Sequence, residues 1–241
     1  HREETRKNRI LARQITEIVK LKAHKAPLSS PEGDTIDSPI DSNTIEAPSG
    51  AVGGAYVRSE NFDAKQLGRV WQWNHNPDDK QWSLKGGKLR LNSLPAEQLM
   101  WARNTLTQRV IGPKSVATVE LSVKGLKDGD VCGLGNINVP CSWIGVSLPP
   151  APSLKGRGNK YLLRCFEQLT NDTIDMTIEL PKGKIWLRSV GDYDNDQAQY
   201  AYSTDGVTFQ TLGRWMPLSY QLISFQGSRH ALFAFNTKGK Q

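Results

Sequence analysis

The stretch SVATVELSVKG, residues 115–125, decides the fold class. Its odd-numbered positions from 117 to 123 are Ala, Val, Leu and Val, whereas the even-numbered positions between them are Thr, Glu and Ser. A period of two puts the two sets on opposite faces of a β-strand. We therefore expect a strand with one face in a core, followed by a turn at the Lys-Gly pair.

The same alternation recurs along the chain from about residue 58. It is clear in GGKLRLNS (86–93), GKIWLRSV (183–190) and DQAQYAYSTDG (196–206). Shorter runs predict further strands at 100–110, 131–136, 142–148, 159–166, 173–180, 207–213, 219–226 and 230–236. Strands and helices do not alternate, which argues against an α/β fold. The pattern predicts an all-β protein, a β-sandwich of jelly-roll type with two antiparallel sheets.

The first 57 residues have a different character. Residues 5–24, TRKNRILARQITEIVKLKAH, carry apolar side chains at helical spacing among Lys and Arg. We expect an amphipathic basic helix within residues 1–25, which would pad the main domain or pair with a partner. Pro, Ser, Gly and acidic residues dominate residues 26–57, which predicts a linker. Residues 58–241 then form the sandwich module.

The bulk numbers narrow the function classes. The net charge of the 241 residues is +7, but from residue 58 onward the basic residues are scattered and form no stripe. Nucleic-acid binders concentrate their charge, so we expect no nucleic-acid partner. No apolar run approaches the length of a membrane span, and residues 1–25 contain no signal-peptide core.

The cysteines leave two interpretations open. Cys132, Cys141 and Cys165 form no CxxC pair, which argues against a zinc site. Cys132 and Cys141 flank the stretch GLGNINVP. If that stretch is a hairpin, the two sulfurs could form a disulfide in an oxidising compartment; otherwise they are buried thiols.

Aromatic and planar polar side chains are unusually dense in two segments. VWQWNHNPDDKQWSL (70–84) holds three Trp and one His beside an Asn-Pro-Asp turn. In WARNTLTQR (101–109), strand alternation would place Trp101, Arg103 and Arg109 on one face. Indole rings stack on the C–H face of a sugar, and planar polar groups bind its hydroxyls. A tryptophan in a strand is also commonly part of the core, so both interpretations stand.

Five segments together resemble one known family. They are LGRVWQWNHNPDDKQWSL, MWARNTLTQRVIGPKSVATVELSVKGLKDGDVCGLG, SWIGV, YAYSTDGVTFQTLG and SRHALFAFNTKG. In this order they resemble the C-terminal concanavalin A-like module of glycoside hydrolase family 43 enzymes, which are β-xylosidases and α-arabinofuranosidases. The module type is also classed as a xylan-binding module of carbohydrate-binding family 91. The resemblance covers about residues 58–240.

The resemblance implies a function, and the sequence departs from the family pattern in two respects. It implies a non-catalytic module that binds xylan or arabinoxylan of the plant cell wall, beside a glycosidase domain and outside the cell. Residues 1–57 are too short for the catalytic five-bladed propeller, and the family's further strand after FNTKG has no counterpart. We expect either a missing edge strand or an N-terminal segment that fills the gap. A structural protein that docks into a larger assembly through its N-terminal helix and linker is the alternative.

The residues expected to contact sugar are Trp73, His75, Arg103 and Trp143. We expect no catalytic residue, because glycoside hydrolysis needs two carboxyl groups at a fixed separation and no such pair is evident. We also expect no cofactor. Asp192, Asp194 and Asp196 alternate like the start of a calcium loop, but the Gly and Glu that an EF-hand requires are absent. An acidic turn is therefore favoured over a calcium site.

Overall fold

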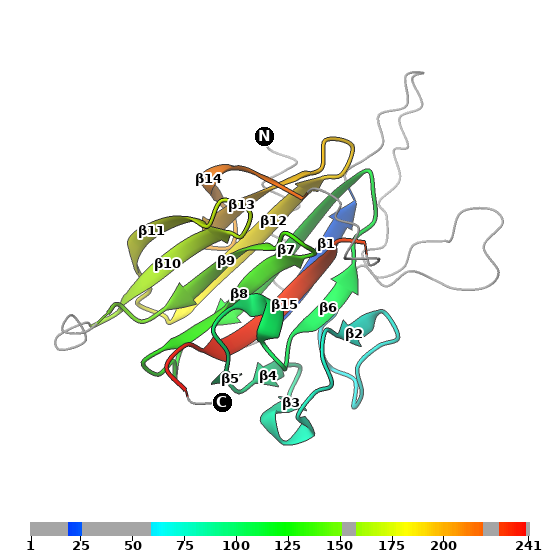
Figure 1. The fold of residues 1–241 in the computed structure, drawn as a ribbon. Helices are drawn as coiled ribbons and strands as arrows, with labels where there is room; N and C mark the ends of the chain where they lie inside the picture. Colours follow the sequence, from blue (N-terminus) through cyan, green and yellow to red (C-terminus); the bar gives the residue numbers. More distant parts are fainter. Residues whose placement is uncertain (1–18, 26–58, 151–157, 219–226, 240–241) are drawn as a thin grey trace.

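The computed structural model describes residues 19–25, 59–150, 158–218 and 227–239, and it confirms the predicted β-sandwich (Figure 1). One sheet has five strands in the order β1-β7-β12-β13-β14. Their bounds are Val19–Lys25, Lys114–Ser122, Lys184–Asp192, Gln197–Ser203 and Gln210–Pro217. Each pairs antiparallel with its neighbours; short turns join β12 to β13 and β13 to β14, whereas β1–β7 and β7–β12 are long-range pairs.

The second sheet lies in front of the first in Figure 1 and has eight strands. Seven follow the order β11-β10-β9-β8-β15-β6-β2, with bounds Asp172–Glu179, Lys160–Glu167, Ser142–Ser147, Asp130–Ile137, Arg229–Asn236, Leu106–Arg109 and Trp71–Trp73. The short strand β5 (Leu94–Pro95) pairs parallel with β15, and a separate hairpin joins β3 (Trp82–Leu84) to β4 (Leu89–Leu91). The segment 219–226, predicted as a strand, lies outside the described residues.

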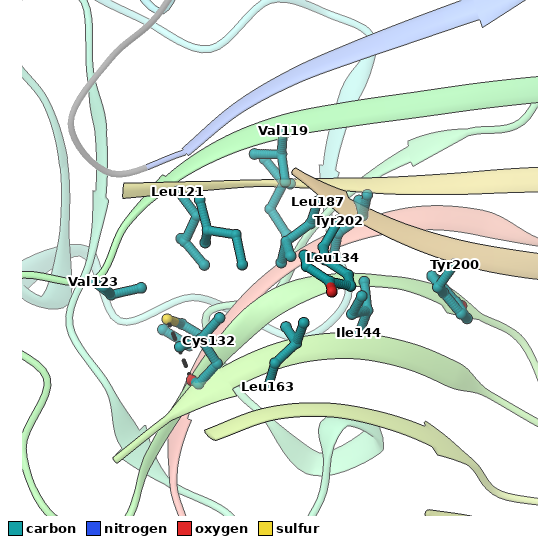
Figure 2. Close-up of a cluster of buried hydrophobic side chains, with 14 of the residues drawn as sticks. Val119, Leu121, Val123, Cys132, Leu134, Ile144, Leu163, Leu187, Tyr200 and Tyr202 are labelled. Carbon is teal, nitrogen blue, oxygen red and sulfur yellow. Dashed lines mark hydrogen bonds between the residues drawn. The ribbon is translucent and has the colours of Figure 1, made fainter. Parts of the chain in front are cut away.

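The main core fills the space between the two sheets. Val119, Leu121 and Leu187 of the five-stranded sheet face Leu134 and Ile144 of the other sheet, and all five side chains are fully or almost fully buried (Figure 2). They occupy the positions that strand alternation assigns to the inner faces. Burial of a Val, Leu or Ile side chain contributes about 1.5–3 kcal/mol, which makes this layer the main source of stability.

A second, smaller cluster lies on the outer face of the eight-stranded sheet. The 3₁₀ helix η2 (Leu99–Trp101) inserts Leu99 into it, and Phe233 and Phe235 of β15 complete it. The other 3₁₀ helix, η1 (Asp79–Gln81), precedes β3. Both helices have three residues, and no helix of the described part could cross a bilayer.

The N-terminal expectation needs correction over the residues that the structure describes. Val19–Lys25 is not helical; it forms β1, which pairs antiparallel with β7 (Figure 1). The sequence VKLKAHK alternates apolar and basic residues, so its period fits a strand as well as a helix, and pairing satisfies the open edge of β7. Two alternatives were expected for the sheet edge: a missing strand, or an N-terminal segment that fills the gap. The N-terminal segment does supply an edge strand. Residues 1–18 and the predicted linker lie outside the described residues.

The three cysteines are free and buried, so the disulfide alternative is ruled out for Cys132 and Cys141. Cys132 stands opposite Val146 in the β8–β9 ladder, whereas the backbone of Cys141 exchanges hydrogen bonds with Gln168 of the β10–β11 turn. Burial raises the pKa of all three thiols to about 12. The thiolate fraction at neutral pH is therefore negligible.

We expect these thiols to be unreactive in the folded protein. Ellman's reagent at pH 8 should give no rapid colour with the native chain and three equivalents in guanidinium, because only unfolding exposes the sulfurs. A rapidly reacting equivalent under native conditions would contradict the burial that the structure assigns.

Candidate functional site

An exposed tryptophan stands beside the second cluster. Trp101, the last residue of η2, is 62% exposed, the highest value among large apolar side chains of the described residues. Its neighbours Leu99 and Ala102 are 0% and 1% exposed. The backbone on both sides of Trp101 is thus anchored in the sheet, while its indole is presented to solvent.

Two loops are joined on either side of Trp101 in the chain, through Met100 and Arg103. Arg103 Nε donates to the carbonyl of Asn76 at 2.9 Å, and the ring of His75 lies 2.6 Å from the carbonyl of Met100. We call His75, Asn76, Met100, Trp101 and Arg103 the Trp101 platform. The platform brings together two of the predicted site residues from segments 25 or more positions apart in the chain.

A buried asparagine fixes the relative position of these loops. Asn104 accepts from the backbone N–H of Asp78 at 2.8 Å through Oδ1 and donates from Nδ2 to the carbonyl of the same residue at 3.2 Å. The backbone N–H of Asn74 also donates to the carbonyl of Thr105 at 2.9 Å. A side chain that uses both of its polar atoms on one backbone unit acts as a rigid clasp, so the platform is held in one geometry.

Besides the exposed indole, the platform carries both a donor and an acceptor. A carbonyl oxygen only accepts, so His75 must carry its proton on Nε2 and presents Nδ1 as an acceptor when neutral. Arg103 uses Nε for Asn76, and its two Nη groups make no hydrogen bond to the described residues. An apolar plane with an adjacent donor and acceptor matches a pyranose, which has a C–H face and a rim of hydroxyls.

Trp73, which was expected to contact sugar, packs against the core. It follows Trp71 and Gln72 in β2 and points toward the inner side, where it packs against the core and against Trp82 with ring centroids 5.0 Å apart. Trp71 is 7% exposed and contacts Phe62. The indoles of the 70–84 segment therefore serve mainly the fold, and Trp73 is not part of the platform.

Trp143 is also placed differently from the expectation. It is 6% exposed and lies among Phe166, Phe233 and Phe235, with ring centroids 5.5–6.5 Å away. Its ring covers Gly145, which has no side chain to exclude it. No face of this indole is open to a ligand, so the role assigned to Trp143 from sequence is corrected to one in the outer cluster.

The acidic triplet lies at the β12–β13 turn. Asp192 ends β12, Asp194 and Asp196 are exposed turn residues, and Asn195 donates from Nδ2 to Asp192 Oδ2 at 2.9 Å. That hydrogen bond is the main cause that lowers the pKa of Asp192. Within the described ranges, no group of three or more His, Cys, Asp or Glu side chains is arranged to hold a metal ion.

The predicted stripe over 101–109 is only partly a strand. Residues 99–101 form η2, and β6 begins at Leu106. Thr105 and Thr107 are fully buried and bond to backbone carbonyls, so the exposed part of the stripe is Trp101, Arg103 and Arg109. Sequence reasoning listed Trp101 in the stripe but favoured Trp73. The arginine and asparagine that follow Trp101 within three positions were the signal that could have ranked it first.

A groove of about 790 Å³ lies at the other end of the β8–β15 ladder, where Asp130 pairs with Asn236. Lysines and amides surround its rim, and core residues such as Leu121 form its floor. An ion pair between Lys238 and Asp128 at 2.7 Å crosses this rim. The aromatic residue that lines the groove is Phe233, which is 0% exposed, so the groove offers no stacking surface.

Comparison with known proteins defines the class first. Residues 59–241 match the family model of the β-xylosidase C-terminal concanavalin A-like domain, so the chain belongs to that family. Solved structures agree: the bifunctional GH43-CE protein of Bacteroides eggerthii superimposes with a TM-score of 0.66 at 29% identity, over 75% of this chain and 24% of that one. An engineered GH43 enzyme described as having endo-xylanase and exo-arabinofuranosidase activity gives 0.62 at 28% identity, over 75% and 37%.

Two curated relatives are described as a putative β-xylosidase and a β-xylosidase. A putative β-xylosidase of Xylanibacter ruminicola is 28% identical over 181 residues, which are 73% of this chain and 31% of that protein. A β-xylosidase of Formosa agariphila is 27% identical over 228 residues, 85% of this chain and 35% of that protein. The chain thus spans about a third of the length of these curated relatives.

Proposed function

We propose that this chain is a non-catalytic carbohydrate-binding module for xylan-type polysaccharide, accessory to a family 43 glycosidase domain. The Trp101 platform carries the proposal: an exposed indole with a free guanidinium end and an imidazole acceptor beside it. Glycoside hydrolysis uses two carboxyl groups, and the five platform residues include none, so the chemistry of this surface is binding. A plant cell-wall substrate implies that the module acts outside the cell.

The chemistry of the platform side chains supports a role for each of them in this proposal. The indole of Trp101 covers the C–H face of one xylose unit, Arg103 donates to ring hydroxyls, and His75 Nδ1 accepts from a hydroxyl. An open platform buries little of the sugar, and each hydroxyl exchanges water for a protein partner, so the affinity of a single site is low. Long chains with many equivalent sites would gain by avidity.

Replacing Trp101 by Ala is expected to weaken xylan binding about tenfold, or about 1.4 kcal/mol, because the stacking surface is lost. Affinity electrophoresis in gels containing soluble xylan measures the effect. The matched control is Trp215→Ala, which removes an indole that is 39% exposed on β14 of the other sheet. If Trp101→Ala and the wild-type chain were retarded equally in the xylan gel, the proposal would be contradicted.

The assembly alternative has lost part of its basis. It relied on an N-terminal helix as a docking element, and Val19–Lys25 is an edge strand of the five-stranded sheet. Light scattering alongside the gel separates the two ideas: unchanged mobility in xylan together with a large mass favours assembly.

A further inference from the structure

Two arginines face each other on the outer side of the eight-stranded sheet. Arg109 of β6 and Arg229 of β15 are antiparallel register partners, and they are exposed and partly exposed, respectively. Directly opposed residues have Cβ atoms about 5 Å apart, and like charges in that position are destabilising. A fold that keeps this arrangement carries an uncompensated double positive charge.

No carboxylate of the described residues neutralises the pair. The ion pairs of the described chain involve Arg164, Lys184, Arg214 and Lys238. Arg229 donates from Nη1 to the hydroxyl of Thr107 at 3.5 Å, which is the limit of bonding distance. Burial, and then the charge of Arg109, lower the pKa of Arg229, as expected for two cations without a counter-ion.

The pair borders the anchor of the Trp101 platform. Across β8, the register partner of Arg229 is Ile137, and Ile137 belongs to the outer cluster together with Leu99 and Ala102. Those last two residues flank the platform segment 100–101. The anchor of the platform and the two arginines therefore occupy neighbouring positions on the same outer face of the eight-stranded sheet.

We infer that Arg109 and Arg229 bind the carboxylate of a uronic acid side group on the polysaccharide, an inference that rests on the proposed function. Neutral hydroxyls would leave the double charge uncompensated, whereas a carboxylate supplies two acceptor oxygens that match guanidinium N–H groups. The buried hydroxyl of Thr107 lies 3.5 Å from Arg229 Nη1 and makes a weak contact with that guanidinium. The module would thereby prefer acidic xylan to neutral xylan.

The test compares glucuronoxylan with the same polymer after its carboxyl groups have been reduced to alcohols. Isothermal titration at low salt should give about tenfold tighter binding of the acidic polymer, with a preference that fades at high salt. Arg229→Gln and Arg109→Gln should each reduce the preference to within about twofold without weakening binding of the reduced polymer. Arg214→Gln on β14 removes the same unit charge from the other sheet and should keep the preference.

The outcomes separate this inference from the proposed function. Equal affinity of the wild-type chain for both polymers overturns the uronate site but leaves xylan binding intact. A preference that survives both arginine substitutions also overturns it. If neither polymer binds, both proposals fail. Poly-glutamate that binds through Arg229 while glucuronoxylan does not would assign the pair to an acidic polypeptide and overturn the inference. Melting temperatures at or slightly above that of the wild-type chain should accompany Arg109→Gln and Arg229→Gln, because each removes the repulsion between the two opposed cations.

Discussion

A single methyl group at Gly133 is expected to lower the free energy of unfolding by about 3 kcal/mol or more. A Cβ atom built there lies 2.1 Å from the carbonyl oxygen of Ile144 and 2.7 Å from the Cα atom of Gly145. Both atoms belong to the backbone of β9, which cannot move aside as a flexible side chain would. Accommodating Ala therefore requires β8 and β9 to separate, at the cost of ladder hydrogen bonds.

Urea unfolding followed by tryptophan fluorescence measures this loss. Gly227→Ala is the matched control, because it adds the same methyl group at an exposed position with nothing within 4 Å. That variant should differ from the wild-type chain by less than about 1 kcal/mol. If the two variants had the same midpoint and the same slope, the close β8–β9 approach would be contradicted.

Glycines on the outer face also explain where the candidate site lies. A Cβ at Gly135 would come within 3.0 Å of Leu99, and one at Gly145 within 3.1 Å of the ring of Trp143. The absence of side chains leaves room for η2 and for the Trp143 ring to pack directly on the sheet. Because η2 is seated there, Trp101 is lifted out into solvent. The exposure of one indole thus depends on glycines more than 30 positions away.

This dependence shows what the sequence could and could not predict. Alternation located most strands of the sandwich, because a two-layer core imposes a period of two on them. It missed β5, and the segment that forms β1 was predicted to be helical. It misassigned Trp143, since both faces of β9 are buried and alternation no longer separates core from surface. It also extended a strand through residues 100–105, where η2 and the Asn104 clasp interrupt the ladder. The loops of His75 and Arg103 are joined by tertiary contacts, which no local pattern in the sequence could reveal.

Acidification from pH 6.5 to pH 4 is expected to destabilise the fold by about 3 kcal/mol through His230 alone. His230 is 0% exposed on the inner side of β15, and its Nε2 lies 3.0 Å from the hydroxyl of Ser115. Its register partner Asn136 donates to Ser189 and Tyr200, while Oδ1 of Asn136 and Nδ1 of His230 have no partner. No carboxylate of the described residues stabilises a charged imidazole here, and burial lowers the pKa of His230 from 6.5 to about 4.

The sign follows from proton uptake. Between pH 6.5 and 4 the unfolded chain protonates His230 while the folded chain keeps it neutral, so the unfolded state binds more protons and stability falls as the pH falls. The difference between a pKa of 6.5 in the unfolded chain and about 4 in the folded chain corresponds to about 3 kcal/mol. This loss of stability is complete once the pH is below 4. Urea unfolding at half-unit pH steps should show this slope in the wild-type chain. His230→Gln keeps a polar group near Ser115 but cannot titrate in this range, so its slope should be smaller by up to one proton. Parallel pH profiles of the two proteins would place the acid sensitivity in the carboxylates, and the buried imidazole would then have to accept its proton without unfolding.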